Sequence, residues 1–311
     1  AVWKIIETDL APLLQHMDPD AIDAIWEKMW WHLHFVGRGG MASFAMAAVD
    51  IALWDLRGHR ESLALWRLLG GRDPEVPAYA GGIDLYLPTE SLLSQAKDFL
   101  GQGFRAIKMK VGRQQILEDV ERVQAMRNLL GPNFPLMADA NMGWSIDQAI
   151  KAVDALSQFD LYWLEEPLIP EDLEGHERLG RESRIPIATG ENLHSVHEFE
   201  HLINYGHVDF PEPDAATLGG ITPWMRVAEL AQSKGLPVTS HGIHDVHVHL
   251  LAGISNASYL EVHGFGLERF IERRIELKEG KAIAPDTPGH GVKLDLVKLK
   301  EYREATYSST N

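Results

Sequence analysis

The sequence predicts an α/β protein built on a (β/α)8 barrel of the TIM type, and three observations lead to this fold. From residue 76 onward, short apolar segments alternate with helical stretches, a pattern typical of right-handed parallel β–α units. Eight such units follow one another over roughly 200 residues, the size of one barrel. Every predicted strand from the second to the eighth also ends on an ionisable residue. In a barrel, such residues meet at one shared site.

The strand and helix segments can be placed along the chain. The eight predicted strands are the segments 76–81, 106–111, 136–141, 161–166, 185–191, 208–214, 236–241 and 259–263. The helical stretches between them include 115–130, 146–156 and 222–234. A doubly wound open sheet is the alternative. We favour the barrel because open sheets usually have fewer strands and a glycine-rich phosphate-binding turn, and we find no GxGxxG or Walker motif.

Residues 1–75 are predicted to be the helical part of an N-terminal capping domain. Asp18, followed by a proline, is a plausible N-cap for the first clear helix. A second, alanine-rich helix is predicted over 42–58. Two of its acidic residues, Asp50 and Asp55, could be mistaken for catalytic groups. We interpret them as helix-packing or capping residues.

The remaining residues divide into the barrel, 76–270, and a C-terminal segment, 271–311. This segment contains a predicted hairpin around Glu279-Gly280 and a turn-rich loop. We expect it to pack back on the N-terminal helices and to complete a smaller α+β capping domain. We also expect the N-terminal part of that domain to be incomplete, with the chain beginning partway into it.

Composition excludes several classes of function. Hydrophobic residues make up 45% of the chain and charged residues 24%, as in ordinary globular proteins. The net charge of −16 disfavours nucleic acid and anionic membranes as partners. No apolar run is long enough to span a membrane. Cysteine is absent, which removes disulfides and thiolate chemistry and is compatible with the cytoplasm, the location that we expect.

Residues capable of chemistry lie at the predicted strand ends, where barrel enzymes carry their active sites. They are Lys108 and Lys110, Asp139 and Asn141, Glu165, Glu191, Asp214, His241 and Glu261. Lys108 and Lys110 are two residues apart on one strand, so both side chains point to the same face. Two buried ammonium groups are costly unless carboxylates or a substrate anion lie beside them.

Three of the carboxylates, Asp139, Glu165 and Glu191, come from consecutive strands and suggest a metal site. Without a cation they would repel one another and raise one another's pKa values. Oxygen ligands with room for water and substrate suit Mg2+, with Mn2+ next. Zinc is less favoured, because this trio includes no histidine or cysteine.

The run of histidines that follows the seventh predicted strand invites a zinc interpretation. We favour a structural one, in which His244, His247 and His249 enter the next helix and pack, cap or face the loops.

The other strand-end residues suggest acid–base chemistry. A carboxylate such as Asp214 fixes the tautomer of a neighbouring imidazole and raises its basicity, so the pair with His241 predicts a general base or acid. Lys110 would face it across the barrel, with a pKa lowered by Lys108 and the metal. Glu261, if protonated, could donate a hydrogen bond to a substrate carboxylate.

These parts fit the abstraction of a proton next to a carboxylate, where a dianionic enolate must be stabilised as it forms. The second acid–base group then has two possible tasks. It may return a proton to carbon, which gives racemisation or epimerisation. It may instead protonate a departing β-hydroxyl, which gives dehydration to a 2-keto acid.

Taken in order, the motifs resemble the enolase superfamily and within it the mandelate racemase group. They are KxK at Lys108-Met-Lys110, DxN at Asp139-Ala-Asn141, ExP at Glu165-Glu-Pro167, GEN at Gly190-Glu-Asn192, PDxxxxGGIT at 213–222, SH at Ser240-His241 and LE at Leu260-Glu261. The muconate-lactonising branch carries a lysine where this chain has Asp214. The glucarate dehydratase branch has an asparagine as third metal ligand, where this chain has Glu191.

The resemblance implies roles for individual residues. It implies Asp139, Glu165 and Glu191 as Mg2+ ligands, Lys110 and the His241–Asp214 dyad as the two acid–base groups, and Glu261 as the electrophilic group. Lys108 would assist Lys110 and, with Asn141 and Glu261, bind the substrate. Members of the group normally begin with a small antiparallel sheet and a mobile loop that helps to select the substrate, and we expect this chain to start after them.

Our first functional prediction is an Mg2+-dependent dehydratase that converts an acid sugar, an aldarate or aldonate, to a 2-keto-3-deoxy acid. The runner-up is a racemase or epimerase of a 2-hydroxy acid, and the third hypothesis is a non-catalytic barrel. The expected partner is a small-molecule carboxylate. Because related proteins are often dimers or octamers, we also expect a homo-oligomer.

Overall fold

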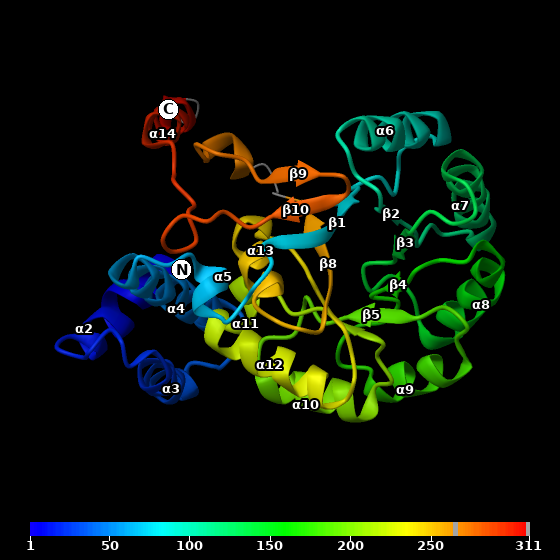
Figure 1. Cartoon of the computed structure of the whole chain (residues 1–311). Helices are drawn as coiled ribbons and strands as arrows, with labels where there is room; N and C mark the ends of the chain where they lie inside the picture. The colour runs from blue at the N-terminus through cyan, green and yellow to red at the C-terminus, as the bar shows by residue number, and fades with distance from the viewer. Residues whose placement is uncertain (264–266, 309–311) are drawn as a thin grey trace.

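The computed structural model describes residues 1–263 and 267–308, and its centre is a barrel of eight parallel strands (Figure 1). The strands are β1 Glu75–Gly81, β2 Ile107–Lys110, β3 Leu136–Asp139, β4 Leu164–Glu165, β5 Ile187–Thr189, β6 Phe210–Pro211, β7 Val238–Ser240 and β8 Ala257–Val262. The predicted (β/α)8 barrel is confirmed. Residues 264–266 and 309–311, which the predicted barrel and tail include, lie outside this description.

Parallel ladders join the strands in the order β6-β5-β4-β3-β2-β1-β8-β7. Strands β6 and β7 contact each other, so the sheet closes. Several strands are shorter than predicted. Strand β4 ends at Glu165 because Glu166 has a positive φ of 42° and Pro167 has no N–H to donate to a ladder. The polar side chains at these strand ends, such as Glu165, therefore lie at the mouth of the barrel.

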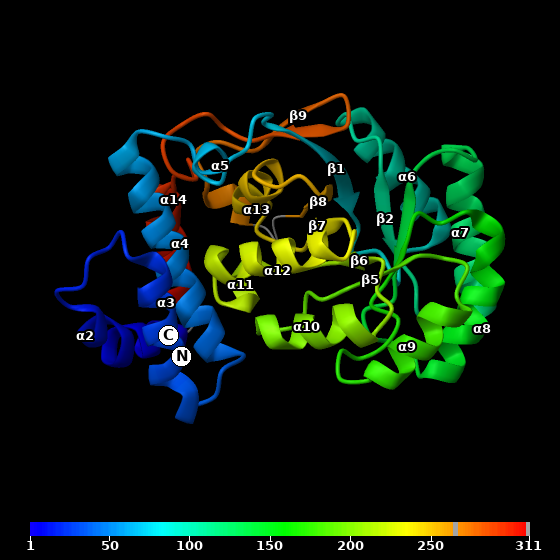
Figure 2. The ribbon, with the colours of Figure 1, turned by 60° about the horizontal axis from the view of Figure 1, so that its bottom comes forward.

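Helices surround the strands and bury the outer face of the barrel, as Figure 2 shows. They are α6 Thr89–Gly101, α7 Ile116–Leu130, α8 Ile146–Leu156, α9 Leu173–Glu182, α10 Val196–Tyr205, α11 Ala215–Leu218, α12 Ile221–Ser233 and α13 His244–Ala252, with a 3-10 turn at Ser157–Phe159 after α8. The three helices predicted from sequence correspond to α7, α8 and α12. Their ends differ from the predicted ends by at most one residue.

Aromatic side chains plug the interior of the barrel below the strand ends. Tyr79 and Trp163 meet edge to face, with ring centroids 5.5 Å apart, and Phe210 lies 5.1 Å from Trp163. Tyr259, Ala106, Met137 and Ala188 complete the cluster. Because side chains alternate along a strand, the residue two positions further on must also point inward. We call this cluster the aromatic floor, because the polar residues of the next layer lie directly above it.

The N-terminal residues are helical, as predicted. The elements are α1 Val2–Ile5, a π turn at Ile6–Leu10, α2 Ala11–Leu14, α3 Ile22–His32, a 3-10 turn at Leu33–Phe35, α4 Met41–Glu61 and α5 Leu65–Leu68. The predicted start of the first clear helix is wrong. The Asp18 side chain accepts a hydrogen bond from the N–H of Asp20, and its carbonyl accepts one from Ala21, so residues 18–21 form a turn before α3.

Asp50 connects α4 to the barrel, which confirms its predicted packing role. Its carboxylate accepts hydrogen bonds from the N–H of Thr222, at 2.9 Å, and from the Thr222 hydroxyl, at 2.7 Å, at the start of α12. The side chain is buried, and burial raises the pKa of Asp50 to about 6. The aspartate thus satisfies donors at a helix N-terminus that would otherwise be buried without partners.

We therefore expect Asp50→Ala to lower the free energy of unfolding by about 3 kcal/mol, the combined cost of a lost cap and a buried unpaired donor. Urea unfolding followed by circular dichroism measures this loss. Asp154→Ala, an exposed position on α8, is the matched control and should change stability by less than about 0.5 kcal/mol. Equal effects of the two substitutions would contradict the capping role.

The C-terminal tail returns to the N-terminal helices. It contains a 3-10 turn, Leu267–Phe270, strands β9 Glu276–Lys278 and β10 Lys281–Ile283, and α14 Leu296–Ser308. The predicted hairpin is confirmed: β9 and β10 pair antiparallel around Glu279-Gly280, where both φ angles are positive. Strand β10 pairs antiparallel with β1, and Asp55 accepts a hydrogen bond from the N–H of His290 at 2.9 Å. The division at residues 75 and 270 remains our proposal.

Of the helices described, none combines the length and the apolar character that crossing a bilayer would require.

Candidate active site

A layer of charged side chains lies directly above the aromatic floor. On five strands, the residue two positions after a floor residue is ionisable and almost fully buried. These residues are Lys108, Asp139, Glu165, Glu212 and Glu261. Four of the five were predicted from the sequence, and Glu212 was not. This layer contains four carboxylates and one lysine. Residues nearer the mouth of the barrel, which we call the rim, are not included in it.

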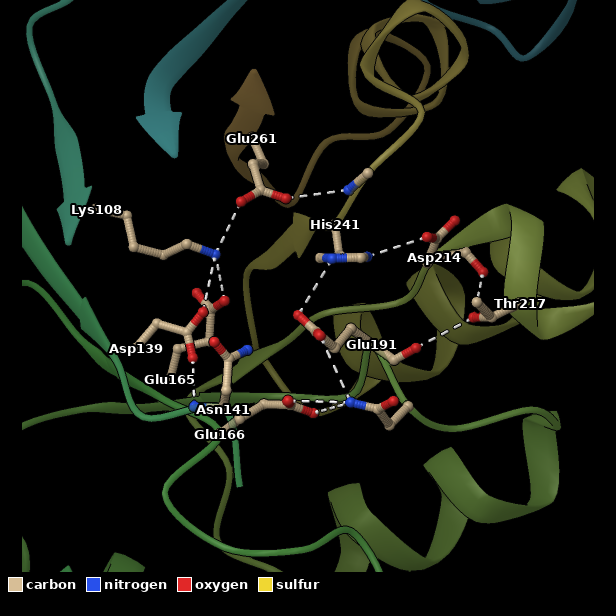
Figure 3. Close-up of polar contacts among 12 residues, drawn as sticks. Lys108, Asp139, Asn141, Glu165, Glu166, Glu191, Asp214, Thr217, His241 and Glu261 are labelled. Atoms are coloured by element: carbon tan, nitrogen blue, oxygen red, sulfur yellow. Dashed lines mark hydrogen bonds and ion pairs between the residues drawn. The ribbon is translucent and has the colours of Figure 1, made fainter. Parts of the chain in front are cut away.

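The ammonium group of Lys108 lies between Glu261 on one side and Asp139 and Glu165 on the other, as Figure 3 shows. Its ammonium group contacts a carboxylate oxygen of Glu165, lies 2.9 Å from Glu261 and 3.6 Å from Asp139. Burial alone would lower the pKa of Lys108, but the attraction of Glu165 and Glu261 outweighs it and raises the pKa well above its usual value. Lys108 is therefore a fixed positive charge, and the expectation that carboxylates lie beside it is confirmed.

Lys110 lies at the rim and pairs with Asp139, with 2.5 Å between its ammonium nitrogen and Oδ2. We expected Lys108 and a bound metal together to lower the pKa of Lys110, and without the metal Asp139 opposes that shift. Burial and Lys108 lower the pKa of Lys110, but Asp139 raises it by more than they lower it, so the net shift is upward. Asp139 also accepts a hydrogen bond from the N–H of Asn141 at 2.8 Å. Despite burial, the two lysines lower the pKa of Asp139.

We expected Glu261 to donate a hydrogen bond only if it were protonated, and the groups around it favour the ionised form. Burial would raise its pKa, but Lys108, His241 and the N–H of Gly242 lower it to about 2. The Gly242 N–H donates to Oε2 at 3.0 Å. In this arrangement Glu261 is a carboxylate that accepts hydrogen bonds from both sides.

The predicted contact between His241 and Asp214 is present. The imidazole Nδ1 lies 3.1 Å from Asp214 Oδ2, and Nε2 lies 3.5 Å from Glu191 Oε2. Asp214 is held in turn by the N–H of Ala216 at 2.7 Å. Burial lowers the pKa of His241, but the bond to Asp214 and the charges of Glu261 and Glu191 raise it to about 10. The imidazole is therefore oriented, and in this charge environment it is protonated near neutral pH.

Glu165 and Glu191 come together with Glu212 in a cluster suited to a cation. One carboxylate oxygen of each lies within 4.8 Å of the other two. Burial, followed by repulsion among these carboxylates, raises the pKa of Glu165 and Glu212, and burial also raises that of Glu191. Asp139 is not in this group, because its carboxylate faces the two lysines. All-oxygen ligands in negative excess fit Mg2+, so the donor set suits the predicted metal.

Sequence reasoning missed two buried acids, Glu212 and Glu166. Asn192 donates from its amide to both oxygens of Glu166, at 2.9 and 3.0 Å. Burial and the nearby Glu191 raise the pKa of Glu166 to about 8. The signal that could have found Glu212 is its spacing of two residues before Asp214, the same spacing that placed Lys108 and Lys110 on one face.

His247 and His249, two of the histidines that follow β7, make packing contacts of the kind predicted. His247 accepts a hydrogen bond from the N–H of Ala215 and contacts the carbonyl of Gly242, so it connects the start of α11 to the loop after β7. His249 accepts one from the N–H of Trp66 on α5. Among the described residues, no imidazole belongs to a metal-suited group.

The raised pKa of His241 predicts a pH dependence of stability. Its value is about 10 in the folded protein and about 6.5 when unfolded, so its contribution is complete below pH 6.5 and is lost as the pH rises toward 10. We expect His241→Asn to destabilise the metal-free protein by roughly 3 to 5 kcal/mol at pH 6 and much less at pH 10. Urea unfolding with a chelator, at several pH values, measures this. A difference that does not change with pH would contradict the assigned pKa.

Comparison with known proteins agrees with this geometry. Residues 1–70 match the N-terminal domain of the mandelate racemase / muconate lactonizing enzyme family, and residues 91–298 match the enolase C-terminal domain-like family. A 3,6-anhydro-alpha-L-galactonate cycloisomerase from Streptomyces coelicolor is 52% identical over 96% of this chain and 83% of its own length. An L-talarate/galactarate dehydratase from Salmonella typhimurium is 39% identical over 92% of this chain and 72% of its own.

Solved structures show the same likeness. A racemase from Streptomyces coelicolor, crystallised with bound magnesium, superposes with a TM-score of 0.94 at 50% identity and covers 96% of this chain and 83% of its own. An L-talarate dehydratase from Polaromonas sp. JS666, complexed with Mg and L-glucarate, has a TM-score of 0.88 at 38% identity and covers 92% and 80%. The prediction of magnesium agrees with both. The chain belongs to the mandelate racemase / muconate lactonizing enzyme family of the enolase superfamily.

Proposed function

We propose that this protein removes the proton α to the carboxylate of an acid sugar and expels the oxygen on the β-carbon, giving a 2-keto-3-deoxy acid. The observation that carries the proposal is the single site in which a lysine pair, an oriented imidazole and a group of buried carboxylates meet. The dehydratases among the relatives support the acid-sugar substrate. Our first choice of reaction remains dehydration, which makes the protein a hydro-lyase.

Asp139, Glu165 and Glu191 would hold the magnesium ion, which when bound polarises the substrate carboxylate and so acidifies the α-carbon. Lys108 would bind the same carboxylate, because its charge is fixed and faces the site. Lys110 is the candidate base. Without the metal, the contact with Asp139 raises the pKa of Lys110 and keeps its amine protonated. If Asp139 also bound the magnesium ion, its carboxylate would raise the pKa of Lys110 less.

His241 is the candidate acid for the second half of the reaction. A β-oxygen is a poor leaving group unless it is protonated as the bond breaks. The hydrogen bond to Asp214 favours the protonated imidazole, which can donate that proton, and it fixes the ring orientation. Asn141 and Glu261 remain predicted substrate contacts, with Glu261 accepting rather than donating hydrogen bonds.

The 52% identical cycloisomerase favours a second candidate. In a 3,6-anhydro sugar acid, the β-oxygen is tethered to the far end of the molecule. The same proton abstraction and the same protonation of oxygen by His241 would then open a ring instead of releasing water. One site therefore supports both reactions, and the substrate decides which is observed. Racemisation or epimerisation, our earlier runner-up, would use the same residues without loss of the β-oxygen.

Mass spectrometry of the products separates these reactions. The protein with Mg2+ would be incubated with aldarates, aldonates and 3,6-anhydro-aldonates, and 2-keto products would be trapped with semicarbazide. Dehydration gives a keto acid lighter than the substrate by one water, and cycloisomerisation gives one of unchanged mass. Inverted substrate with no keto acid would establish a racemase or epimerase. No product from any acid would contradict the proposed function. The expected homo-oligomer stays a prediction, which sedimentation velocity would test.

A further inference from the structure

Glu212 is a buried carboxylate with no hydrogen-bond partner among the described residues. Its exposed fraction is 0%, and neither of its oxygens is paired. A buried unpaired carboxylate is costly, because it loses its hydration and gains nothing in return. The neighbouring charged groups are already engaged: Lys108 contacts Glu165, Glu261 and Asp139, and Lys110 contacts Asp139. What Glu212 lacks is a positive charge.

Glu212 follows directly after β6, and its N–H donates a hydrogen bond to the carbonyl of Thr189 on β5. Phe210 belongs to the aromatic floor, and Asp214 holds His241 at the rim. Glu212 lies between them in the sequence and on the same inward face. Its carboxylate is close enough to Glu165 and Glu191 for all three to contact one ion, since one oxygen of each lies within 4.8 Å of the others.

We propose that Glu212 is a ligand of the divalent cation, which it binds together with Glu165 and Glu191 from the floor side of the barrel. This inference rests on the cation site of the proposed function and adds a carboxylate to it. Asp139 remains the ligand candidate on the side of the lysines. The added charge would tighten cation binding, because the number of charged ligands is one of the factors that set affinity at all-oxygen sites.

The test is Mn2+ binding to the full chain, followed by the electron paramagnetic resonance signal of the free ion. Glu212→Gln removes the charge and keeps the shape. The matched control is Glu166→Gln, which removes an equally buried neighbouring carboxylate that Asn192 already partners. We expect Glu212→Gln to raise the dissociation constant at least about tenfold more than Glu166→Gln does. Water-proton relaxation should show an additional water on the bound Mn2+ of the Glu212→Gln variant.

Thermal unfolding without metal shows whether the variants fold. We expect Glu212→Gln to melt higher than the unchanged protein, because it removes the cost of burying an ionisable group without a partner, and to gain less from added Mn2+. Equal losses in the two variants, or an unchanged dissociation constant, would overturn the inference. If Glu165→Gln abolishes binding while Glu212→Gln does not, only the inference fails. If the unchanged protein binds no Mn2+, the cation site of the proposed function fails with it.

Discussion

Lys110→Ala is expected to abolish both turnover and exchange of the α-proton with solvent. Lys110 is the group that we assign to proton abstraction, and general acid–base groups contribute about 10²- to 10⁴-fold to a rate. We therefore expect kcat to fall by about 10³-fold or more. Proton NMR in D2O follows the loss of the α-proton signal and the formation of product in the same sample.

The control for this variant is Lys97→Ala, an exposed position on α6, which should leave both rates unchanged. Binding of Mn2+ to the Lys110→Ala variant shows that its site is intact. Persistent α-proton exchange in that variant would mean that another residue is the base, and the roles of Lys110 and His241 would have to be reversed.

His241→Asn is expected to separate the two halves of the reaction. The β-oxygen loses its proton donor, so turnover should fall by about 10²- to 10⁴-fold. Exchange of the α-proton should continue, because Lys110 is intact. Asp214→Asn should act in the same direction, since the imidazole loses the carboxylate that orients it and raises its pKa.

The same NMR experiment measures both rates, and His197→Asn, an exposed histidine on α10, is the matched control. Parallel loss of exchange and turnover in His241→Asn would contradict the assignment of His241 as the acid. It would favour His241 as the base instead.

The positions of the site residues were largely predictable, because strand periodicity determines them. Lys108 and Lys110, two residues apart, both approach Asp139, at 3.6 and 2.5 Å. The order of parallel strands also brought Glu165 beside Asp139, its register partner on β3. Neighbouring strands in a barrel place their ends together, so residue type and strand order were sufficient for these contacts.

Glu212 was missed because the predicted strand was followed only to its last acidic residue, Asp214. The prolines on either side of Glu212 also disguise the alternation, since they end the ladder after Pro211. The alternation of inward-facing residues becomes visible once Phe210 is placed in the aromatic floor. From Phe210, a step of two residues reaches Glu212 and a further step reaches Asp214.

The charge states of Lys110 and Glu261 could not be predicted from the sequence. Both depend on distances in three dimensions rather than on residue type. Lys110 keeps its proton because Asp139 lies 2.5 Å away, and Glu261 loses its proton because Lys108 lies 2.9 Å away. A pattern of residues shows which groups meet, but the balance between burial and individual charges appears only with the coordinates.

The most direct test of the central claim is proton NMR of the unchanged protein in D2O with an acid sugar, with Mg2+ and with a chelator. We predict a 2-keto-3-deoxy product that has lost the α-proton and carries solvent deuterium at C3, formed only with Mg2+. Product formed equally with the chelator would contradict the metal-assisted abstraction. So would Mn2+ binding combined with neither exchange nor product from any acid.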